Sequence, residues 1–213
     1  MLEKQDEARM EAQKLKKIIV DSKDVYDEQV DGSRRNFIKN GALVAGGLAI
    51  SGEELFARTQ RRKRQEALLL HNVHLNKTFY ANFFDGERYN ITGLFQIDKA
   101  LMDYRAWQIA RIDLKLVNLL YEINRFVGTQ HKINIISGYR SPATNRYLRR
   151  HSRGVAKHSY HMKAQAADIQ IPGIRLSKLR EIARSIGAGG VGYYPRSNFV
   201  HVDVGPVRSW RRG

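Results

Sequence analysis

The 213-residue chain contains no cysteine and only four prolines. Without cysteine, no disulfide framework can hold the fold, and no thiolate can act as a nucleophile or as a metal ligand. Any metal site must therefore be built from histidines and carboxylates. The hydrophobic content of 42%, with two Trp, ten Tyr and eight Phe, argues against a disordered chain and suffices for one domain with a real core.

Acidic residues are scarce in most of the chain. Residues 1–57 contain 9 Lys+Arg and 11 Asp+Glu, a net charge of −2, whereas residues 58–213 contain 28 and 10, a net charge of +18. Such a positive field favours polyanionic partners, which include nucleic acid. The sequence has no helix-turn-helix, RNP or zinc-finger pattern, so we expect no nucleic acid and favour a cell wall or an anionic membrane surface. Many of these side chains can equally form a solvated surface.

A short apolar run near the start of the chain follows a pair of arginines. The segment 33–39 (SRRNFIK) fits the S-R-R-x-F-[LI]-K pattern of a twin-arginine (Tat) export signal, and the run 41–50 has ten residues, against the roughly 20 that span a bilayer. We therefore predict an N-terminal extension with a Tat signal peptide at 1–57, a basic linker at 58–65 and a catalytic domain at 66–213. The alternative for 33–39 is a basic turn that caps a buried helix. An export signal places the protein in the periplasm or cell envelope.

The hydrophobic pattern of the remaining chain predicts an α+β fold, in which a small antiparallel sheet packs against helices in a single domain. Apolar and polar residues alternate from Glu66 through a hairpin, and we interpret His71 and His74 within it as packing or surface histidines. A helical period runs from Gln96 to Val127, with Asp98, Asp103 and Asp113 read as surface charges. The later pattern predicts a strand at 132–136, a helix at 143–150, a strand at 167–171, a helix at 176–186, and two antiparallel strands at 189–194 and 198–204.

Three separated residues have the chemistry of a metal site. His161, Asp168 and His201 supply two imidazoles and a carboxylate, the set that a catalytic zinc ion uses when its fourth position stays open for water. Strand alternation places His201 and Asp203 on one face, toward whatever His161 and Asp168 approach. We predict one Zn²⁺ per chain and a hydrolase.

Three segments carry a resemblance to a known family: SGYRS at 137–141, VAKHSYHMKAQAADI at 155–169, and GVGYYPRSNFVHVDVGPVRSW at 190–210. They resemble the LAS-type zinc peptidases, in the group of murein endopeptidase K. This superfamily also contains the D-Ala-D-Ala metallopeptidases and the hedgehog signalling domain. The resemblance implies the hedgehog/D-Ala-D-Ala peptidase-like fold and zinc ligands at His161, Asp168 and His201. It also implies that Arg140 binds the scissile carbonyl oxygen or a substrate carboxylate.

Two positions depart from the family pattern. Ala164 replaces the glycine of HxxGxAxD, which matters only if the backbone there needs a positive φ or a close approach, and we expect the site to tolerate it. Asn198 stands where several relatives carry Glu or Asp, and an amide cannot act as a general base. Asp203 is our candidate base, although it can equally orient a ligand imidazole, and His158 is the reserve. Three further residues either line the substrate pocket or only close a turn: Ser137, Tyr139 and Asn145.

The resemblance implies a zinc metallo-endopeptidase that hydrolyses peptide crosslinks of peptidoglycan in cell wall remodelling. The expected bond is the L,D linkage between two diaminopimelate residues, and the nearest alternatives are a D,D-endopeptidase and a D,D-carboxypeptidase. The alternative that is not an enzyme is a noncatalytic zinc-containing wall-binding module. It is motivated by Asn198, which replaces the acidic residue of several relatives. The partners that we expect are peptidoglycan and, during secretion, the Tat export machinery, and we expect a monomer.

Overall fold

The computed structural model describes residues 65–128, 131–152 and 155–212. The Tat signal predicted at 1–57 lies outside the described residues, as does all of the predicted linker except Gln65, so both stay predictions. No helix in the described part of the chain is long and apolar enough to cross a membrane.

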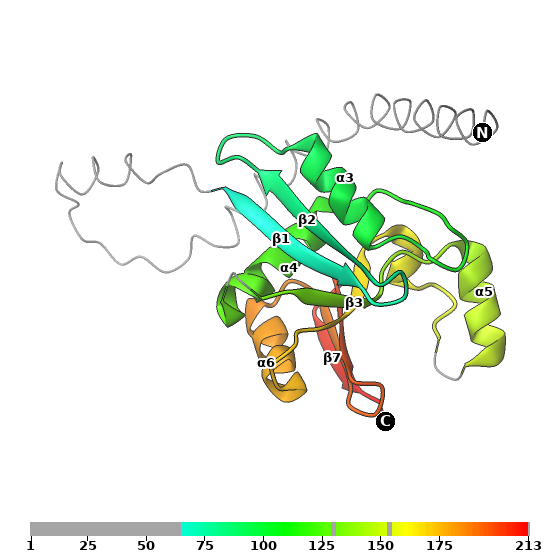
Figure 1. Ribbon diagram of the computed structural model, residues 1–213. Helices are drawn as coiled ribbons and strands as arrows, with labels where there is room; N and C mark the ends of the chain where they lie inside the picture. The colour runs from blue at the N-terminus through cyan, green and yellow to red at the C-terminus, as the bar shows by residue number, and fades with distance from the viewer. Residues whose placement is uncertain (1–64, 129–130, 153–154, 213) are drawn as a thin grey trace, which may run out of the picture. The chain divides into compact units, whose positions relative to one another are not determined.

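Strands and helices alternate irregularly along the described chain (Figure 1). In order, they are β1 (Glu66–Asn72), β2 (Lys77–Phe84), α3 (Ile91–Ala100), α4 (Leu114–Val127), β3 (Ile133–Ser137), α5 (Pro142–His151), the 3-10 helix η1 (Tyr160–Lys163), β4 (Ala166–Gln170), α6 (Leu176–Ile186), β5 (Gly190–Tyr194), β6 (Phe199–Asp203) and β7 (Arg208–Arg211).

The strands of the described residues form one seven-stranded sheet in the order β2-β1-β3-β4-β6-β5-β7. The α+β prediction is confirmed, but the sheet is larger than expected and mixed, because β1 pairs with β3, and β5 with β7, in parallel. Local alternation reveals that a segment is a strand. It does not reveal strand direction, which depends on the connections between strands.

The single helix predicted from Gln96 to Val127 is wrong, since α3 and α4 are separate helices joined by residues 101–113. Asp113 begins α4 as its N-cap, and its carboxylate accepts a hydrogen bond from the N–H of Lys115. Gly128 ends this helix, as predicted. The apolar period continues across the junction, which is why periodicity alone did not reveal it.

The interpretation of Asp98 and Asp103 as surface charges is also wrong. Their exposed fractions are 4% and 2%. Asp98 accepts a hydrogen bond from the N–H of Ile112, and Asp103 accepts from the N–H groups of Arg105 and Ala106. Aspartates that satisfy backbone donors in a connection cannot be told from solvated charges by their spacing.

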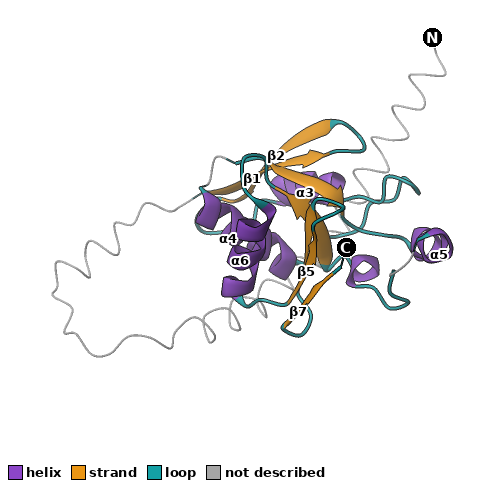
Figure 2. Cartoon of the chain, turned by 90° about the horizontal axis from the view of Figure 1, so that it is seen from below, coloured by secondary structure: helices purple, strands orange, loops and turns teal. Residues whose placement is uncertain are grey.

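Two helices, α4 and α6, pack on one side of the sheet. Figure 2 shows α4 and α6 side by side on one side of the strands and α5 on the other. Ile169 of β4 pairs with Val200 of β6, and both are fully buried. Because successive side chains alternate between faces, Asp168 and His201 point to the face opposite this core.

Candidate metal centre and active site

Asp168 and His201 lie directly opposite each other in the register of β4 and β6, and η1 brings His161 beside them. His201 Nδ1 lies 2.8 Å and His161 Nε2 lies 3.3 Å from Asp168 Oδ1, and the two ring nitrogens are 3.2 Å apart. These three residues each offer a ligand atom within 4.8 Å of the others. The structure therefore brings together the three residues that the sequence predicted as ligands.

The second nitrogen of each imidazole is held by an acceptor. His161 Nδ1 lies 2.7 Å from the carbonyl oxygen of Gly138, which can only accept, so this nitrogen carries the hydrogen and Nε2 presents its lone pair. His201 Nε2 donates to Asp203 Oδ2 at 3.0 Å, which directs Nδ1 toward Asp168 Oδ1 and His161 Nε2. Imidazoles fixed in this way, with one carboxylate between them, are the donor set of a divalent zinc-type site. The residues present therefore fit the metal that the resemblance implies.

The electrostatics of the three candidate ligands suit a cation. Burial lowers the pKa of His161 to about 4, so this imidazole is neutral at pH 7. Burial acts to raise the pKa of Asp168, but His161 and His201 hold it well below its usual range. Burial acts to lower the pKa of His201, whereas its hydrogen bonds to Asp168 and Asp203 raise it. A metal ion competes with the proton on His201 Nδ1, because both need the same lone pair.

The two ends of η1 fix the backbone that carries His161. Ser159 is the N-cap of η1, and its Oγ accepts a hydrogen bond from the N–H of His161. Ala164 ends the helix with φ = 55°, in the left-handed region, so the glycine of the family pattern does correspond to a position that needs a positive φ. Alanine in that region costs roughly 1–2 kcal/mol.

Asp203 is fully buried and does not line the cavity described below. Burial acts to raise its pKa, but the hydrogen bonds from His201 and Arg208 outweigh this and hold the pKa below its usual range. Its two oxygens accept hydrogen bonds from His201, the N–H groups of Gly190 and Gly205, and both Nη groups of Arg208. Of the two roles that the sequence left open, these contacts favour the orientation of His201 over proton transfer to or from substrate.

A cavity of about 740 Å³ opens over the three candidate ligand residues, and Ser137, Arg140 and His158 are part of its lining. Arg140 donates to Asp168 Oδ2 at 2.6 Å and to Ser137 Oγ at 2.9 Å. His158 is exposed and lies on the segment that leads into η1. The reserve candidate for the base, His158, and the predicted carbonyl-binding residue, Arg140, are thus both available to a ligand in this cavity, whereas the first candidate, Asp203, is not.

Tyr139 and Asn145 do not belong to the lining. The N–H of Tyr139 donates to the carbonyl oxygen of Leu101, and Asn145 Nδ2 donates to that of Ala156. Of the two roles predicted for Tyr139 and Asn145, these contacts favour the closing of local turns over the lining of the substrate pocket. Asn198 is exposed in the turn between β5 and β6 with φ = 55°, outside the lining as well. Asparagine tolerates this conformation well, so turn geometry accounts for the residue at this position.

Sequence reasoning missed the residues that two other elements add to the cavity. Residues 101–113 contribute Tyr104 and Arg105, and β7 contributes Arg208 and Trp210. The sequence did contain a signal for β7: after the Gly205-Pro206 turn, the spacing of Arg208 and Trp210 by two residues is typical of a strand that presents both side chains on one face. His74, interpreted as a packing or surface histidine, also lines the cavity, where its ring stacks on Tyr104 at 3.9 Å.

Comparison with known proteins identifies the family of the chain. The sequence model of the peptidase family described as peptidoglycan L,D-endopeptidase MepK matches residues 60–210. Peptidoglycan L,D-endopeptidase MepK of Escherichia coli K12 is 47% identical over 183 residues, which cover 86% of this chain and 100% of that protein. Probable peptidoglycan L,D-endopeptidase MepK of Haemophilus influenzae is 37% identical over 183 residues, covering 85% and 97%. No solved structure matches the chain. With a family match over most of its length, the chain belongs to the MepK family of peptidases.

Proposed function

We propose that this protein is a zinc-dependent endopeptidase that hydrolyses peptide crosslinks of peptidoglycan, with the L,D bond between two diaminopimelate residues as its substrate. The observation that carries the proposal is the convergence of His161, Asp168 and His201 beneath a cavity that also presents Arg140. The names of the relatives, which describe peptidoglycan L,D-endopeptidases, support an L,D bond as the target. A role outside the cytoplasm follows from this substrate, and the Tat signal predicted at residues 33–39 supports the periplasm or cell envelope.

Zinc held by His161, Asp168 and His201 would supply a Lewis acid that polarises the scissile carbonyl and lowers the pKa of a water molecule. The protein provides the fixed positive charge. Arg140 is held by Asp168 and Ser137 through Nη2 and Nε, which leaves the other N–H groups of its guanidinium for a substrate oxygen. Arg140 therefore binds the carbonyl oxygen as negative charge develops on it, or the carboxylate next to the scissile bond.

We assign proton transfer to His158 and orientation to Asp203. His158 is an exposed imidazole in the cavity lining, where it can take a proton from water and return it to the leaving amine. Asp203 is enclosed by five hydrogen bonds and holds His201. The amide at Asn198, which suggested a noncatalytic wall-binding module, lies outside the cavity lining, so it no longer favours that alternative.

The test uses the full chain with zinc and purified muropeptides. Dimers joined by the L,D diaminopimelate bond should be converted to monomers, whereas D,D-joined dimers should stay intact, as separated by liquid chromatography. His161→Ala should abolish conversion and His158→Gln should lower it by about 100-fold or more. If L,D dimers remain whole while pentapeptides lose their terminal D-Ala, the protein is a carboxypeptidase. Uptake of zinc and cosedimentation with cell wall without any turnover would instead support a binding module.

A further inference from the structure

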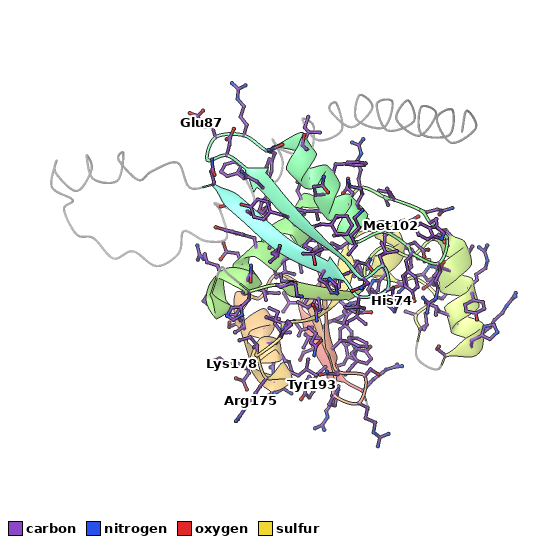
Figure 3. The ribbon with its side chains drawn as sticks, in the orientation of Figure 1. His74, Glu87, Met102, Arg175, Lys178 and Tyr193 are labelled. Atoms are coloured by element: carbon purple, nitrogen blue, oxygen red, sulfur yellow. The ribbon has the colours of Figure 1, made fainter. Side chains whose placement is uncertain are left out.

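A stack of three side chains forms one wall of the cavity. The His74 ring lies 3.9 Å from that of Tyr104 at an interplanar angle of 16°, and the guanidinium of Arg105 lies 4.5 Å from the Tyr104 ring centre. His74 Nε2 is held at 3.0 Å from the carbonyl oxygen of Ile136. Figure 3 labels His74 at the ends of β1 and β3. Arg105 is therefore an exposed cation that rests on a fixed aromatic surface.

One buried carboxylate fixes the backbone next to both Arg105 and Arg140. Asp103 Oδ1 accepts a hydrogen bond from the N–H of Arg105 at 3.1 Å, and Asp103 Oδ2 accepts from that of Ser141 at 2.8 Å. Ser141 directly follows Arg140 in the sequence. Arg105 and Arg140 come from distant parts of the chain, but the backbone at or next to each of them is fixed by the same carboxylate.

The charges of the cavity leave Arg105 free for a ligand. Among the lining residues that the structure describes, Asp168 is the one carboxylate, against five arginines: Arg105, Arg140, Arg208, Arg211 and Arg212. Asp168 pairs with Arg140, and Asp203 pairs with Arg208. No carboxylate among the described residues lies within ion-pair distance of Arg105.

We propose that Arg105 binds the free carboxylate of the donor diaminopimelate, apart from any carboxylate that Arg140 holds next to the scissile bond, and so determines substrate specificity. This inference rests on the proposed function. Two diaminopimelate residues joined by one amide bond each keep a free carboxylate, and a guanidinium recognises a carboxylate through two parallel hydrogen bonds. The enzyme should therefore prefer crosslinks whose carboxylates are free over crosslinks whose carboxylates are amidated.

The experiment compares two L,D dimers: one with free carboxylates, and one with the carboxylate of the donor diaminopimelate amidated. For the first dimer, Arg105→Gln should raise KM by about 10-fold or more and change kcat less than about 2-fold, since the variant loses charged hydrogen bonds to bound substrate that persist in the transition state. For the amidated dimer, the variant should equal the wild type. Arg175→Gln is the matched control, because it removes the same charge from an exposed position beside α6 (Figure 3). It should leave both KM values unchanged.

Binding of the intact dimers to the metal-free full chain, measured by calorimetry, gives a readout that does not need catalysis. If the wild type binds the free-carboxylate dimer more tightly than Arg105→Gln does, yet cleaves neither dimer, the proposed function fails and the carboxylate site stands. An equal loss on both dimers, or no loss on either, overturns the role of Arg105. Arg105→Lys should recover only part of the affinity, because it restores the charge without the forked geometry.

Discussion

His201 and Asp203 lie two residues apart on the same face of β6, and His201 Nε2 is 3.0 Å from Asp203 Oδ2. Both nitrogens of His201 are thereby committed, one to Asp203 and the other to the point where His161 and Asp168 meet. Arg208 in turn holds Asp203 through both Nη groups. A ligand imidazole supported by a carboxylate is more basic and better oriented than one facing water.

This relationship predicts different outcomes for Asp203→Asn and His201→Ala. Asp203→Asn should weaken zinc affinity by about 10–100-fold, and excess zinc should restore most turnover, because the ligand itself remains. His201→Ala should bind no stoichiometric zinc. A competition titration with a chromogenic chelator, followed by muropeptide turnover at saturating zinc, measures both effects. Normal affinity in Asp203→Asn with no turnover at any zinc concentration would identify Asp203 as the base.

Zinc should stabilise the folded protein in a manner that depends on pH. At a zinc concentration 100 times its Kd, the free energy of unfolding should rise by about 2.7 kcal/mol. Burial acts to lower the pKa of His201, but its bonds to Asp168 and Asp203 raise it, so protons compete with zinc at this imidazole up to a higher pH than at an ordinary histidine. The stabilisation should therefore grow as pH rises through that raised pKa. Thermal unfolding with zinc and with chelator, from pH 5 to 8, tests this.

His161→Ala supplies the control for the zinc titration. It removes a ligand whose neutral form already dominates at pH 7, since burial lowers its pKa to about 4. The midpoint of unfolding in this variant should be insensitive to added zinc. A zinc-dependent shift of wild-type size in His161→Ala would place the metal elsewhere.

Asp103 should contribute stability that is lost in acid. Burial acts to raise its pKa, but hydrogen bonds from Thr144, Ser141 and Ala106 lower it on balance. A depressed carboxylate pKa adds stability above the unfolded value of about 3.9, and this contribution disappears as pH falls through the folded value. Asp103→Asn should therefore cost about 1–3 kcal/mol at pH 7 and less at pH 3.

Urea unfolding at pH 7 and pH 3 measures this difference. Glu181→Gln removes an equal charge from an exposed position of α6 and should show no such change between the two pH values. A cost for Asp103→Asn that is the same at both pH values would contradict the assignment of Asp103 as an ionised hydrogen-bond acceptor.

Gly138 should tolerate no side chain. A Cβ there would overlap backbone atoms of Leu101, and the Gly138 carbonyl oxygen also accepts the hydrogen bond from His161. Gly138→Ala should destabilise the fold by about 1–3 kcal/mol and weaken zinc binding, because the displaced carbonyl no longer orients His161. Gly187→Ala, where a Cβ meets nothing within 4 Å but φ is +66°, should cost about 1 kcal/mol and leave zinc affinity unchanged. Equal zinc affinity in the two variants argues against a role for the carbonyl.

The parts of the fold that local periodicity specifies were predictable from the sequence. The hairpin of β1 and β2, the helix α6 with its bounds, and the antiparallel pair β5–β6 all match the expectation. Strand alternation also placed His201 and Asp203 on one face of the same strand, and the observed hydrogen bond joins them. These features depend on residues near one another in the sequence or on the two-residue period of a strand, so they can be predicted from one sequence.

The parts that depend on capping and on strand order were not predictable. Asp103 looks like a surface charge in the sequence, yet it organises the connection that carries Arg105. Ala164 and Asn198 looked like departures from a catalytic motif, yet both occupy left-handed backbone positions. Pairing of β7 with β5 joins segments whose contact no local pattern encodes. Such features follow from tertiary contacts, and the local sequence pattern does not show which of the possible contacts form.

Strand β7 makes the site depend on the edge of the sheet. Arg208 holds Asp203 through both Nη groups, and the ring of Trp210 lies 5.3 Å from that of His201. As the last strand in the sheet order, β7 pairs on one side with β5 and has no strand on its other side among the described residues. Local opening of this edge strand would therefore release Asp203 and loosen His201 without unfolding the rest of the sheet.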